Sequence, residues 1–316
     1  MDLKDVYGAS CNSTVLIQPI GPKTLLDTNR IAISISEKMT FSLLAEAIVW
    51  PKPGLVSAIS NGIHTDMNIF TFTKSSIALN RFFYKSVLEG LKWEGKKYDN
   101  SDLFIKLRHI GLEAEEVMFQ TTNGINTHKG SIFLNIILCG AAGLNYSING
   151  DFNPINICSL AKEISIKHLK DDFNKLKGTE STGMKAYSKY GIRGVRGEVQ
   201  DGFPHILQCG LPVLKECLMD GIDLRISLTH TLITLISKIN DTTILNRKFN
   251  CWRIKYAQLW AKKVLDSGSV FSLSGKIMLD EMEAAFNKYS INPGGSADLL
   301  SSTLALYLWD GGNIDY

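Results

Sequence analysis

The turn Asn126-Thr127-His128-Lys129-Gly130 joins two apolar segments, residues 112–119 and 132–138, and places a pair of helices at the centre of the sequence. Thr127 is the predicted N-cap of the second helix. The lysine in the first turn of that helix opposes the helix macrodipole, and the glycine weakens the helix. An anion bound to the free N–H groups and the lysine would account for both residues. A solvated lysine at a helix start is the structural alternative.

Helical periodicity extends from this pair in both directions. Apolar residues recur at three- and four-residue steps from about Ile35, and the first helix must stop at Pro51. Further helices are expected at about 67–91, 101–120, 129–143, 154–170, 203–219, 222–239, 252–266, 276–289 and 296–309. Because no alternating strand pattern or βαβ rhythm is present, the sequence predicts an all-α, single-domain, multi-helix bundle with Gly-rich functional loops on one rim.

Two segments do not fit the helical pattern. Residues 1–35 lack periodicity and are expected to form an irregular N-terminal arm, which leaves residues 36–316 as the all-helical catalytic domain. Residues 171–202 are polar and contain six glycines. A structureless connection of that length is uncommon, so this stretch is expected to be functional or mobile.

Composition limits the class of protein. The chain has 316 residues, of which 45% are hydrophobic and 21% charged, as in an ordinary globular protein with a large core. A net charge of +3 is too small to indicate general nucleic-acid binding. The six cysteines show no metal-ligand spacing, and neither a signal peptide nor a transmembrane run of 18 apolar residues is recognisable. These features predict a reduced, cytoplasmic protein that does not bind membranes.

Four clusters combine glycines with cations, a carboxylate and a following helix. They are the segments 51–67, 115–130, 190–198 and 293–298. Backbone N–H groups at such turns can surround a phosphate. Each cluster also has a purely structural interpretation as a helix-breaking loop or solvated linker, or, at Ser296, as an N-cap followed by Asp298 as a partner for the helix dipole. None contains a Walker loop or a dinucleotide fingerprint.

Together the clusters hold the groups that a nucleoside triphosphate requires. The cations available for a polyphosphate are Lys52, Lys129, Arg193 and Arg196. The carboxylates available for acid–base chemistry or for Mg²⁺ are Asp66, Glu115, Glu198 and Asp298. Because Mg²⁺ keeps several waters and needs few protein ligands beside substrate phosphates, this inventory favours an enzyme that acts on a nucleoside triphosphate with Mg²⁺, without identifying the reaction.

The ordered series of motifs resembles the triphosphoribosyl-dephospho-coenzyme-A synthase family over about residues 40–310. The blocks that carry the resemblance are Pro51-Lys52-Pro53-Gly54-Leu55-Val56, Gly62-x-His64-x-Asp66-Met67, Glu115-x-x-Met118, Thr122-x-Gly124-x-Asn126-Thr127-His128-Lys129-Gly130, Tyr190-Gly191-Ile192-x-Gly194-x-Arg196-Gly197-Glu198, Gly202-Phe203-Pro204, Asp241-Thr242 and Pro293-Gly294-Gly295-Ser296-Ala297-Asp298. Each block alone is weak, whereas the full series in order is highly specific.

The resemblance implies an all-helical transferase. It would move the triphosphoribosyl group of ATP to the 2′-hydroxyl of 3′-dephospho-CoA and release adenine. The product would pass to an enzyme that modifies the acyl carrier protein of citrate lyase or malonate decarboxylase.

The resemblance also assigns roles to residues of this chain. Catalysis would fall to Asp66, Glu115 and Glu198, and Mg²⁺ to Asp66, Glu115 or Asp298. Substrate or ATP binding would involve Lys52, Gly54, His64, Asn126, His128, Lys129, Arg193, Arg196, Asp241, Arg247, Gly294, Gly295 and Ser296. The sequence leaves open which carboxylate is the general base. It also leaves open the oligomeric state, for which a homodimer is one candidate.

Three departures from the family pattern keep other functions under consideration. Ser57 stands where relatives often carry aspartate, Thr243 where they carry asparagine, and the segment 247–249 where they carry Arg-Gly-Gly. A helical Mg²⁺-dependent hydrolase of ADP-ribose-type substrates would use the same carboxylates with water. A non-catalytic nucleotide- or CoA-binding paralogue would bind its ligands without turnover.

Overall fold

The computed structural model describes residues 24–94, 99–175, 182–245 and 249–314. Over these ranges the chain forms twelve α-helices and no strand, which confirms the predicted all-α class. The helices are α1 (Leu25–Ile48), α2 (Ile69–Leu91), α3 (Asn100–Thr121), α4 (Lys129–Asn149), α5 (Pro154–Lys175), α6 (Thr182–Tyr190), α7 (Gly194–Asp201), α8 (Leu211–Met219), α9 (Leu224–Lys238), α10 (Trp252–Asp266), α11 (Leu273–Tyr289) and α12 (Gly294–Trp309).

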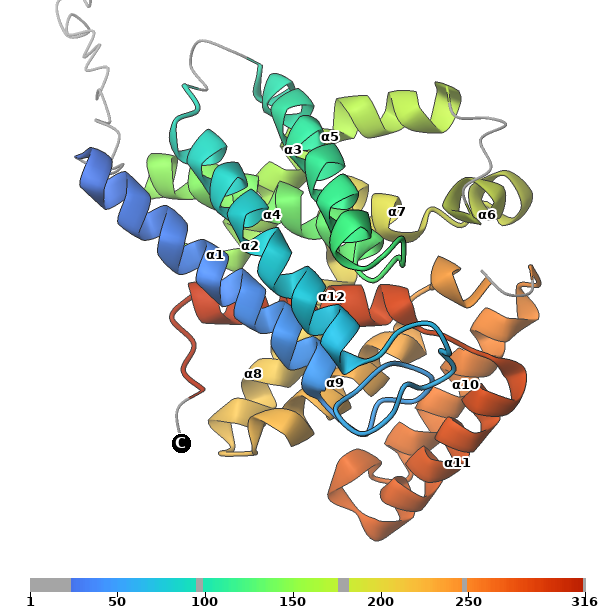
Figure 1. The fold of residues 1–316 in the computed structure, drawn as a ribbon. Helices are drawn as coiled ribbons and strands as arrows, with labels where there is room; N and C mark the ends of the chain where they lie inside the picture. Colours follow the sequence, from blue (N-terminus) through green and yellow to red (C-terminus); the bar gives the residue numbers. More distant parts are fainter. Residues whose placement is uncertain (1–23, 95–98, 176–181, 246–248, 315–316) are drawn as a thin grey trace, which may run out of the picture.

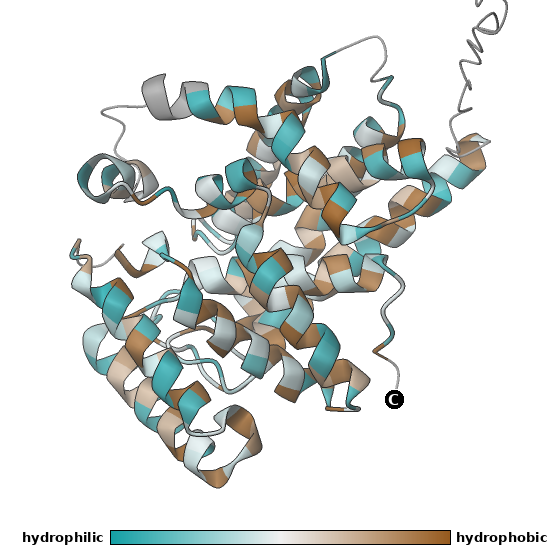
Figure 2. Cartoon of the chain, turned by 180° about the vertical axis from the view of Figure 1, so that it is seen from behind, coloured by the Kyte–Doolittle hydropathy of each residue, from teal (hydrophilic) through white to brown (hydrophobic). Residues whose placement is uncertain are grey.

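Two nearly fully buried helices, α4 and α12, form the centre of the bundle (Figure 1). Helix α2 packs on α4 and on α1. Helices α8 and α9 pack on α12. Most of the remaining helices carry a hydrophobic and a hydrophilic side, as Figure 2 shows. The apolar sides meet in one continuous core, as expected for helices that each bury one stripe.

Close packing of α2 on α4 depends on glycine. A Cβ atom at Gly143 would lie 2.2 Å from the carbonyl oxygen of Val87, so no side chain fits there. Helix α4 is also the one helix in the described part of the chain that is long and apolar enough to cross a membrane. Because 78% of its apolar window is buried inside the protein, its composition is accounted for by its central position.

The N-terminal boundary differs from the sequence prediction. Helix α1 begins at Leu25, and Thr24 caps it by accepting a hydrogen bond from the N–H of Asp27. The expected irregular arm is therefore wrong for residues 24–35, and residues 1–23 lie outside the described ranges. The error arose because the first turns of α1 expose Leu25, Leu26 and Ile33, which hides the helical pattern.

The glycine-rich stretch 171–202 also differs from its prediction as one long loop. It contains the short helices α6 and α7, which are held by tertiary burial of Ala186 and Val199. Gly191, with φ +69°, forms part of the connection between them. Its residues 176–181 lie outside the described ranges. Tertiary packing stabilises helices too short to form alone, so periodicity could not reveal them.

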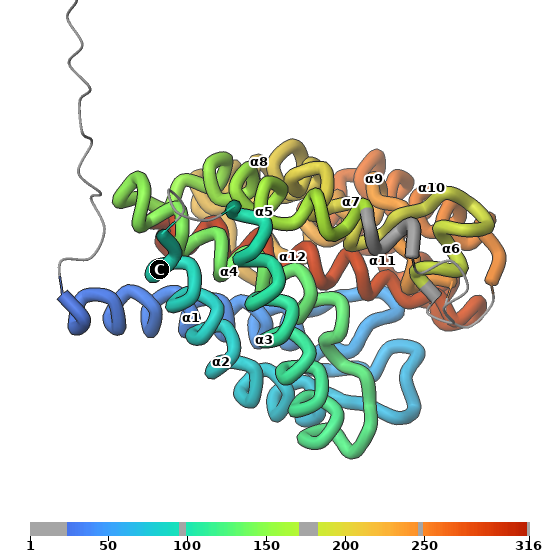
Figure 3. Tube along the Cα trace, turned by 90° about the horizontal axis from the view of Figure 1, so that it is seen from above, coloured from blue at the N-terminus to red at the C-terminus, as the bar shows by residue number. Residues whose placement is uncertain are grey.

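The loops that carry the motif clusters gather on one side of the bundle. The 49–68 loop, the α3–α4 turn, α7 and the N-terminus of α12 lie on the same side in Figures 1 and 3. The structure thus agrees with the predicted placement of functional loops on one rim.

Candidate functional site

Two neighbouring cavities open on this rim. The larger cavity, about 290 Å³, is lined by the α6–α7 connection, α7 and residues 239–242. The smaller cavity, about 110 Å³, is lined by parts of the 49–68 loop, the α3–α4 turn and the start of α12. Asp241, Thr242 and Gly295 line the larger cavity, whereas their chain neighbours Thr243 and Gly294 line the smaller one. These two segments form the wall between the cavities.

The smaller cavity brings together three of the four sequence clusters. Its lining includes the predicted binding residues Lys52, His64, Asn126, His128, Lys129 and Gly294 together with Asp298. Gly54 docks the first loop against the α11–α12 connection, because its Cα faces the carbonyl oxygen of Ile291 so closely that an added Cβ would lie 2.1 Å away. The clusters are therefore one site in space.

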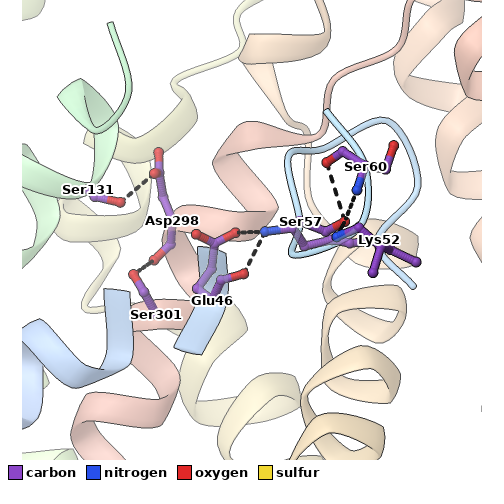
Figure 4. Close-up of polar contacts among 8 residues, drawn as sticks. Glu46, Lys52, Ser57, Ser60, Ser131, Asp298 and Ser301 are labelled. Carbon is purple, nitrogen blue, oxygen red and sulfur yellow. Dashed lines mark hydrogen bonds and ion pairs between the residues drawn. The ribbon is translucent and has the colours of Figure 1, made fainter. Parts of the chain in front are cut away.

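Lys52 is buried in an ion pair that sequence analysis missed. Its Nζ lies 2.6 Å from Oε1 of Glu46 and 2.5 Å from the Glu46 carbonyl oxygen, and the two side chains are only 1% and 6% exposed. Figure 4 shows the Glu46 carboxylate between Lys52 and Asp298. Burial lowers the pKa of Lys52, and the charge of Glu46 opposes that shift. The sequence did contain a signal for this pair. Glu46 continues the apolar stripe of Ile35, Met39 and Leu43 on α1, and a carboxylate in such a position needs a buried partner.

Asp298 projects from the first turns of α12 against the start of α4. Ser131 Oγ donates a hydrogen bond of 2.5 Å to its carboxylate. Gly130 is required at this point, because a Cβ there would lie 1.9 Å from Asp298 Oδ2. Burial, with the nearby negative charges of Glu46 and Asp241, raises the pKa of Asp298 to about 8. Its carboxyl group is thus mostly protonated at neutral pH, unlike the dipole partner expected from sequence.

The N-terminus of α12 is capped by Asp241, which lies more than fifty residues earlier. Pro293 is the N-cap residue and makes no side-chain bond, so the expected N-cap role of Ser296 is wrong. The Asp241 carboxylate accepts from the N–H groups of Gly295 (3.2 Å) and Ser296 (2.8 Å) and from the hydroxyl of Ser296 (3.0 Å). Thr243 donates to it through both its N–H and its hydroxyl. The helix N–H groups expected to bind phosphate are occupied by this carboxylate.

Replacing Asp241 by alanine should lower the free energy of unfolding by about 3 kcal/mol, because several buried donors lose their acceptor together. The side chain is 3% exposed, so water cannot replace it without rearrangement. Urea denaturation followed by circular dichroism measures the change. Asp266→Ala, at the end of α10, is the matched control. A loss below 1 kcal/mol would show that the α12 terminus does not depend on this cap.

His128 is neutral and its ring is fixed on one side. The Nδ1 atom lies 2.7 Å from Ser75 Oγ, and the ring contacts Phe72 edge-on. Burial, together with the positive charge of Lys52, lowers the pKa of His128 to about 3. This predicted ATP-binding residue is therefore an uncharged imidazole at neutral pH.

The start of α4 is capped differently from the prediction. His128 occupies the N-cap position and makes no side-chain capping bond, so Thr127 is not the N-cap. Thr127 Oγ1 instead donates to Ser75 Oγ at 2.9 Å. Asn126 Oδ1 accepts from the N–H of Lys129 at 3.1 Å and satisfies one free group of the helix start.

The larger cavity contains a buried carboxylate–histidine pair. Glu198, on α7, contacts Nδ1 of His205 through Oε1, and its Oε2 is buried without a hydrogen-bond partner. The hydrogen bond of the His205 ring to the Glu198 carboxylate raises the pKa of His205. The motif series did not identify His205 as a site residue, because it lies outside the motif blocks. Its place in the cavity lining makes it a functional candidate.

The predicted arginines lie near the same cavity. Arg193 lines it and is paired with Asp201 through an exposed ion pair. Arg196 lies over the ring of Phe133, 5.7 Å from the centroid, and is not part of either lining. Arg247 lies outside the described residues.

The departures from the family pattern have structural roles here. Ser57 accepts from the N–H groups of Ile59 and Ser60 and so closes a turn of the first loop. Thr243 joins Asp241 to the carbonyl oxygen of Asn292. Phe249 stacks on Tyr190, with ring centroids 5.4 Å apart, and Tyr190 lines the larger cavity. Phe249 thus supports the wall of the site.

The carboxylates expected for Mg²⁺ do not meet. Asp66 is 56% exposed beside His64, and Glu115 pairs with Lys129 at the surface. Neither belongs to the lining that contains Asp298. Among the described residues no three His, Cys, Asp or Glu side chains form a metal cluster. The three candidate carboxylates therefore do not form a shared Mg²⁺ site among the described residues.

Comparison with known proteins identifies the family. A family model described as ATP:dephospho-CoA triphosphoribosyl transferase (CitG) matches residues 32–315. A protein from Photobacterium profundum is 35% identical over 269 residues, which is 84% of each chain. A protein from Streptococcus mutans is 34% identical and covers 88% of this chain and 97% of its own. Both are described as a probable 2-(5″-triphosphoribosyl)-3′-dephosphocoenzyme-A synthase.

These matches span both cavities and every motif block that the structure describes. They confirm the resemblance seen in the sequence and favour a transferase over the hydrolase. The chain belongs to the family of ATP:dephospho-CoA triphosphoribosyl transferases.

Proposed function

We propose that the two cavities bind different substrates of the family reaction. The acceptor 3′-dephospho-CoA binds in the larger cavity, and the reacting end of ATP lies at the wall between the two cavities. The observation that carries this proposal is the Glu198–His205 pair, because Oε2 of Glu198 is buried in the larger cavity without a partner. A buried carboxylate oxygen that lacks a donor is a suitable acceptor for a substrate hydroxyl proton.

The chemistry assigns one proton transfer to each cavity. The 2′-hydroxyl of the acceptor loses its proton to Glu198 while its oxygen bonds to C1′ of the ATP ribose. The bond from C1′ to adenine breaks, and the ribose passes through oxocarbenium character as in glycoside cleavage. Adenine takes up a proton on leaving. Asp298, which retains its proton near neutral pH, lines the smaller cavity and supplies it.

The triphosphate binds through the exposed cations at the rim. Lys129 and Arg193 lie at the two cavities and are paired with Glu115 and Asp201. Exposed ion pairs contribute little to stability, so a triphosphate can displace these carboxylates. Mg²⁺ enters as part of the MgATP substrate. Lys52 does not contact phosphate in this proposal, because Glu46 already neutralises it.

The wider context follows from the reaction. The product would pass, in the cytoplasm, to an enzyme that modifies the acyl carrier protein of citrate lyase or malonate decarboxylase. One matching relative, from Leuconostoc mesenteroides, is described as Protein CitXG, and the chain covers 56% of its length. A homodimer stays a prediction from the sequence.

Incubation with MgATP and 3′-dephospho-CoA, followed by chromatography of bases and nucleotides, tests the proposal. Free adenine is expected only when both substrates are present. Adenine with free ribose triphosphate in the absence of acceptor would favour the hydrolase. Formation of ADP, or ligand binding without any turnover, would contradict the transferase.

A further inference from the structure

His128 presents one unused hydrogen-bonding atom. His128 lines the smaller cavity and is only 2% exposed. Its Nε2 atom is buried and has no hydrogen-bond partner. Buried ring nitrogens are normally bonded, so an unsatisfied one in a cavity wall indicates a missing ligand atom.

The neighbours of His128 determine which kind of atom is missing. Thr127 Oγ1 donates to Ser75 Oγ, and Ser75 is fully buried. The hydroxyl proton of Ser75 then has Nδ1 of His128 as its acceptor at 2.7 Å. With Nδ1 accepting, the single ring proton lies on Nε2. His128 therefore offers a neutral N–H donor, and its ligand must supply an acceptor.

Asn292 supplies the complementary group. Its Oδ1 is also buried without a hydrogen-bond partner, and the residue lines the same smaller cavity. A donor on one residue and an acceptor on another match a ligand edge that carries both an acceptor nitrogen and an N–H group. A phosphate offers acceptors only and would leave Asn292 Oδ1 unsatisfied.

The cavity wall combines polar side chains with an apolar part that can contact a planar ring. Leu55, Val56, Met67, Phe72 and Ala297 line it with apolar surface. The positive charge of Lys52 is neutralised by Glu46, so no buried cation in the wall is left for an anion. A cavity of about 150 Å³ is known to bind benzene. The present cavity is smaller, at about 110 Å³, so it holds one edge of a ring system and the remainder extends towards the rim.

We infer that the smaller cavity is the binding site for the adenine ring, held by Nε2–H of His128 and Oδ1 of Asn292. The inference rests on the proposed function, since it places the base of the donor ATP. Ser75 and Thr127 are positioning residues that fix the tautomer of His128. The 6-amino group of adenine donates to Asn292, and a ring nitrogen accepts from His128.

Binding of free adenine and of purine, which lacks the 6-amino group, tests the contact with Asn292 by calorimetry on the full chain. Adenine is expected to bind about tenfold more tightly than purine. Asn292→Ala should weaken adenine about tenfold and leave purine nearly unchanged, so that the two ligands become equal. Asn156→Ala, an exposed asparagine on α5, is the control. Equal binding of adenine and purine to the wild-type chain would overturn the inference, and this comparison needs no folded variant.

Nuclear magnetic resonance of ¹⁵N-histidine-labelled protein tests His128 directly. The expected spectrum shows the Nε2–H tautomer, no titration between pH 5 and 8, and a shift of Nε2 on addition of adenine. His128→Gln identifies the signal, with the exposed His109→Gln as control. Ser75→Ala should restore a mixture of tautomers and weaken adenine binding. An Nδ1–H tautomer, or an Nε2 signal that adenine does not move, would overturn the inference.

The two proposals fail in different ways. If the enzyme releases adenine but adenine affinity is insensitive to His128 and Asn292, the subsite is wrong and the transferase stands. If adenine binding depends on both residues but no adenine is released with both substrates, the transferase is wrong and the subsite stands.

Discussion

Replacing Glu198 by glutamine is expected to lower the rate of adenine release by about 10²- to 10⁴-fold, the range for loss of a general base. Glutamine keeps the size and the shape of the side chain, but its amide cannot take up the proton of the 2′-hydroxyl. Because Glu198 is only 9% exposed, bulk water cannot act as a base in its place. The measurement is the initial rate of adenine formation from MgATP and 3′-dephospho-CoA.

The control for this change is Glu281→Gln, at an exposed position on α11, which should leave the rate unchanged. Binding of 3′-dephospho-CoA should persist in Glu198→Gln, which separates catalysis from binding. The pKa of His205 should also fall back towards its ordinary value, because the hydrogen bond of its ring to the Glu198 carboxylate raises it. More than a tenth of wild-type activity in Glu198→Gln would exclude this carboxylate as the base.

The second large effect is expected from Lys52→Met, which should lower the free energy of unfolding by about 3–5 kcal/mol, the range for breaking a buried ion pair. The change leaves Glu46 buried without its cation and next to Asp298, as Figure 4 shows. The substitution keeps the length of the side chain, so the loss reports the charge and its hydrogen bonds rather than a cavity. Urea denaturation at pH 7 measures it.

A double variant distinguishes charge from packing. Lys52→Met combined with Glu46→Leu should regain much of the lost stability, because well-packed apolar residues can replace a buried pair. Lys85→Met breaks the exposed pair with Glu113, whose side chains are 51% and 59% exposed, and should cost at most about 1 kcal/mol. Equal losses in the free energy of unfolding for Lys52→Met and Lys85→Met would show that the buried Lys52–Glu46 pair stabilises the fold no more than an exposed pair.

The sequence predicted the helices whose signals are local. Pro51 ends the first helix near its predicted position, and α10 runs over Trp252–Asp266 as the apolar period indicated. The motif series also identified the family and brought Lys52, His128 and Asp298 into one candidate site. Prediction failed where burial stabilises a segment against its local pattern, as in α6 and α7, or where exposed apolar residues obscured the pattern, as at the start of α1.

Only the tertiary structure decided the electrostatic state of the site. The charge of Lys52 depends on Glu46, the neutrality of His128 depends on burial beside Ser75, and the start of α12 depends on Asp241. The sequence by itself determined most of the helices and the family to which the chain belongs, because turns, caps and periodic burial act between near neighbours. The pairing of charges and the burial of the candidate base Glu198 were decided by the fold, because helices distant in sequence set the distances and the solvent exposure on which these interactions depend.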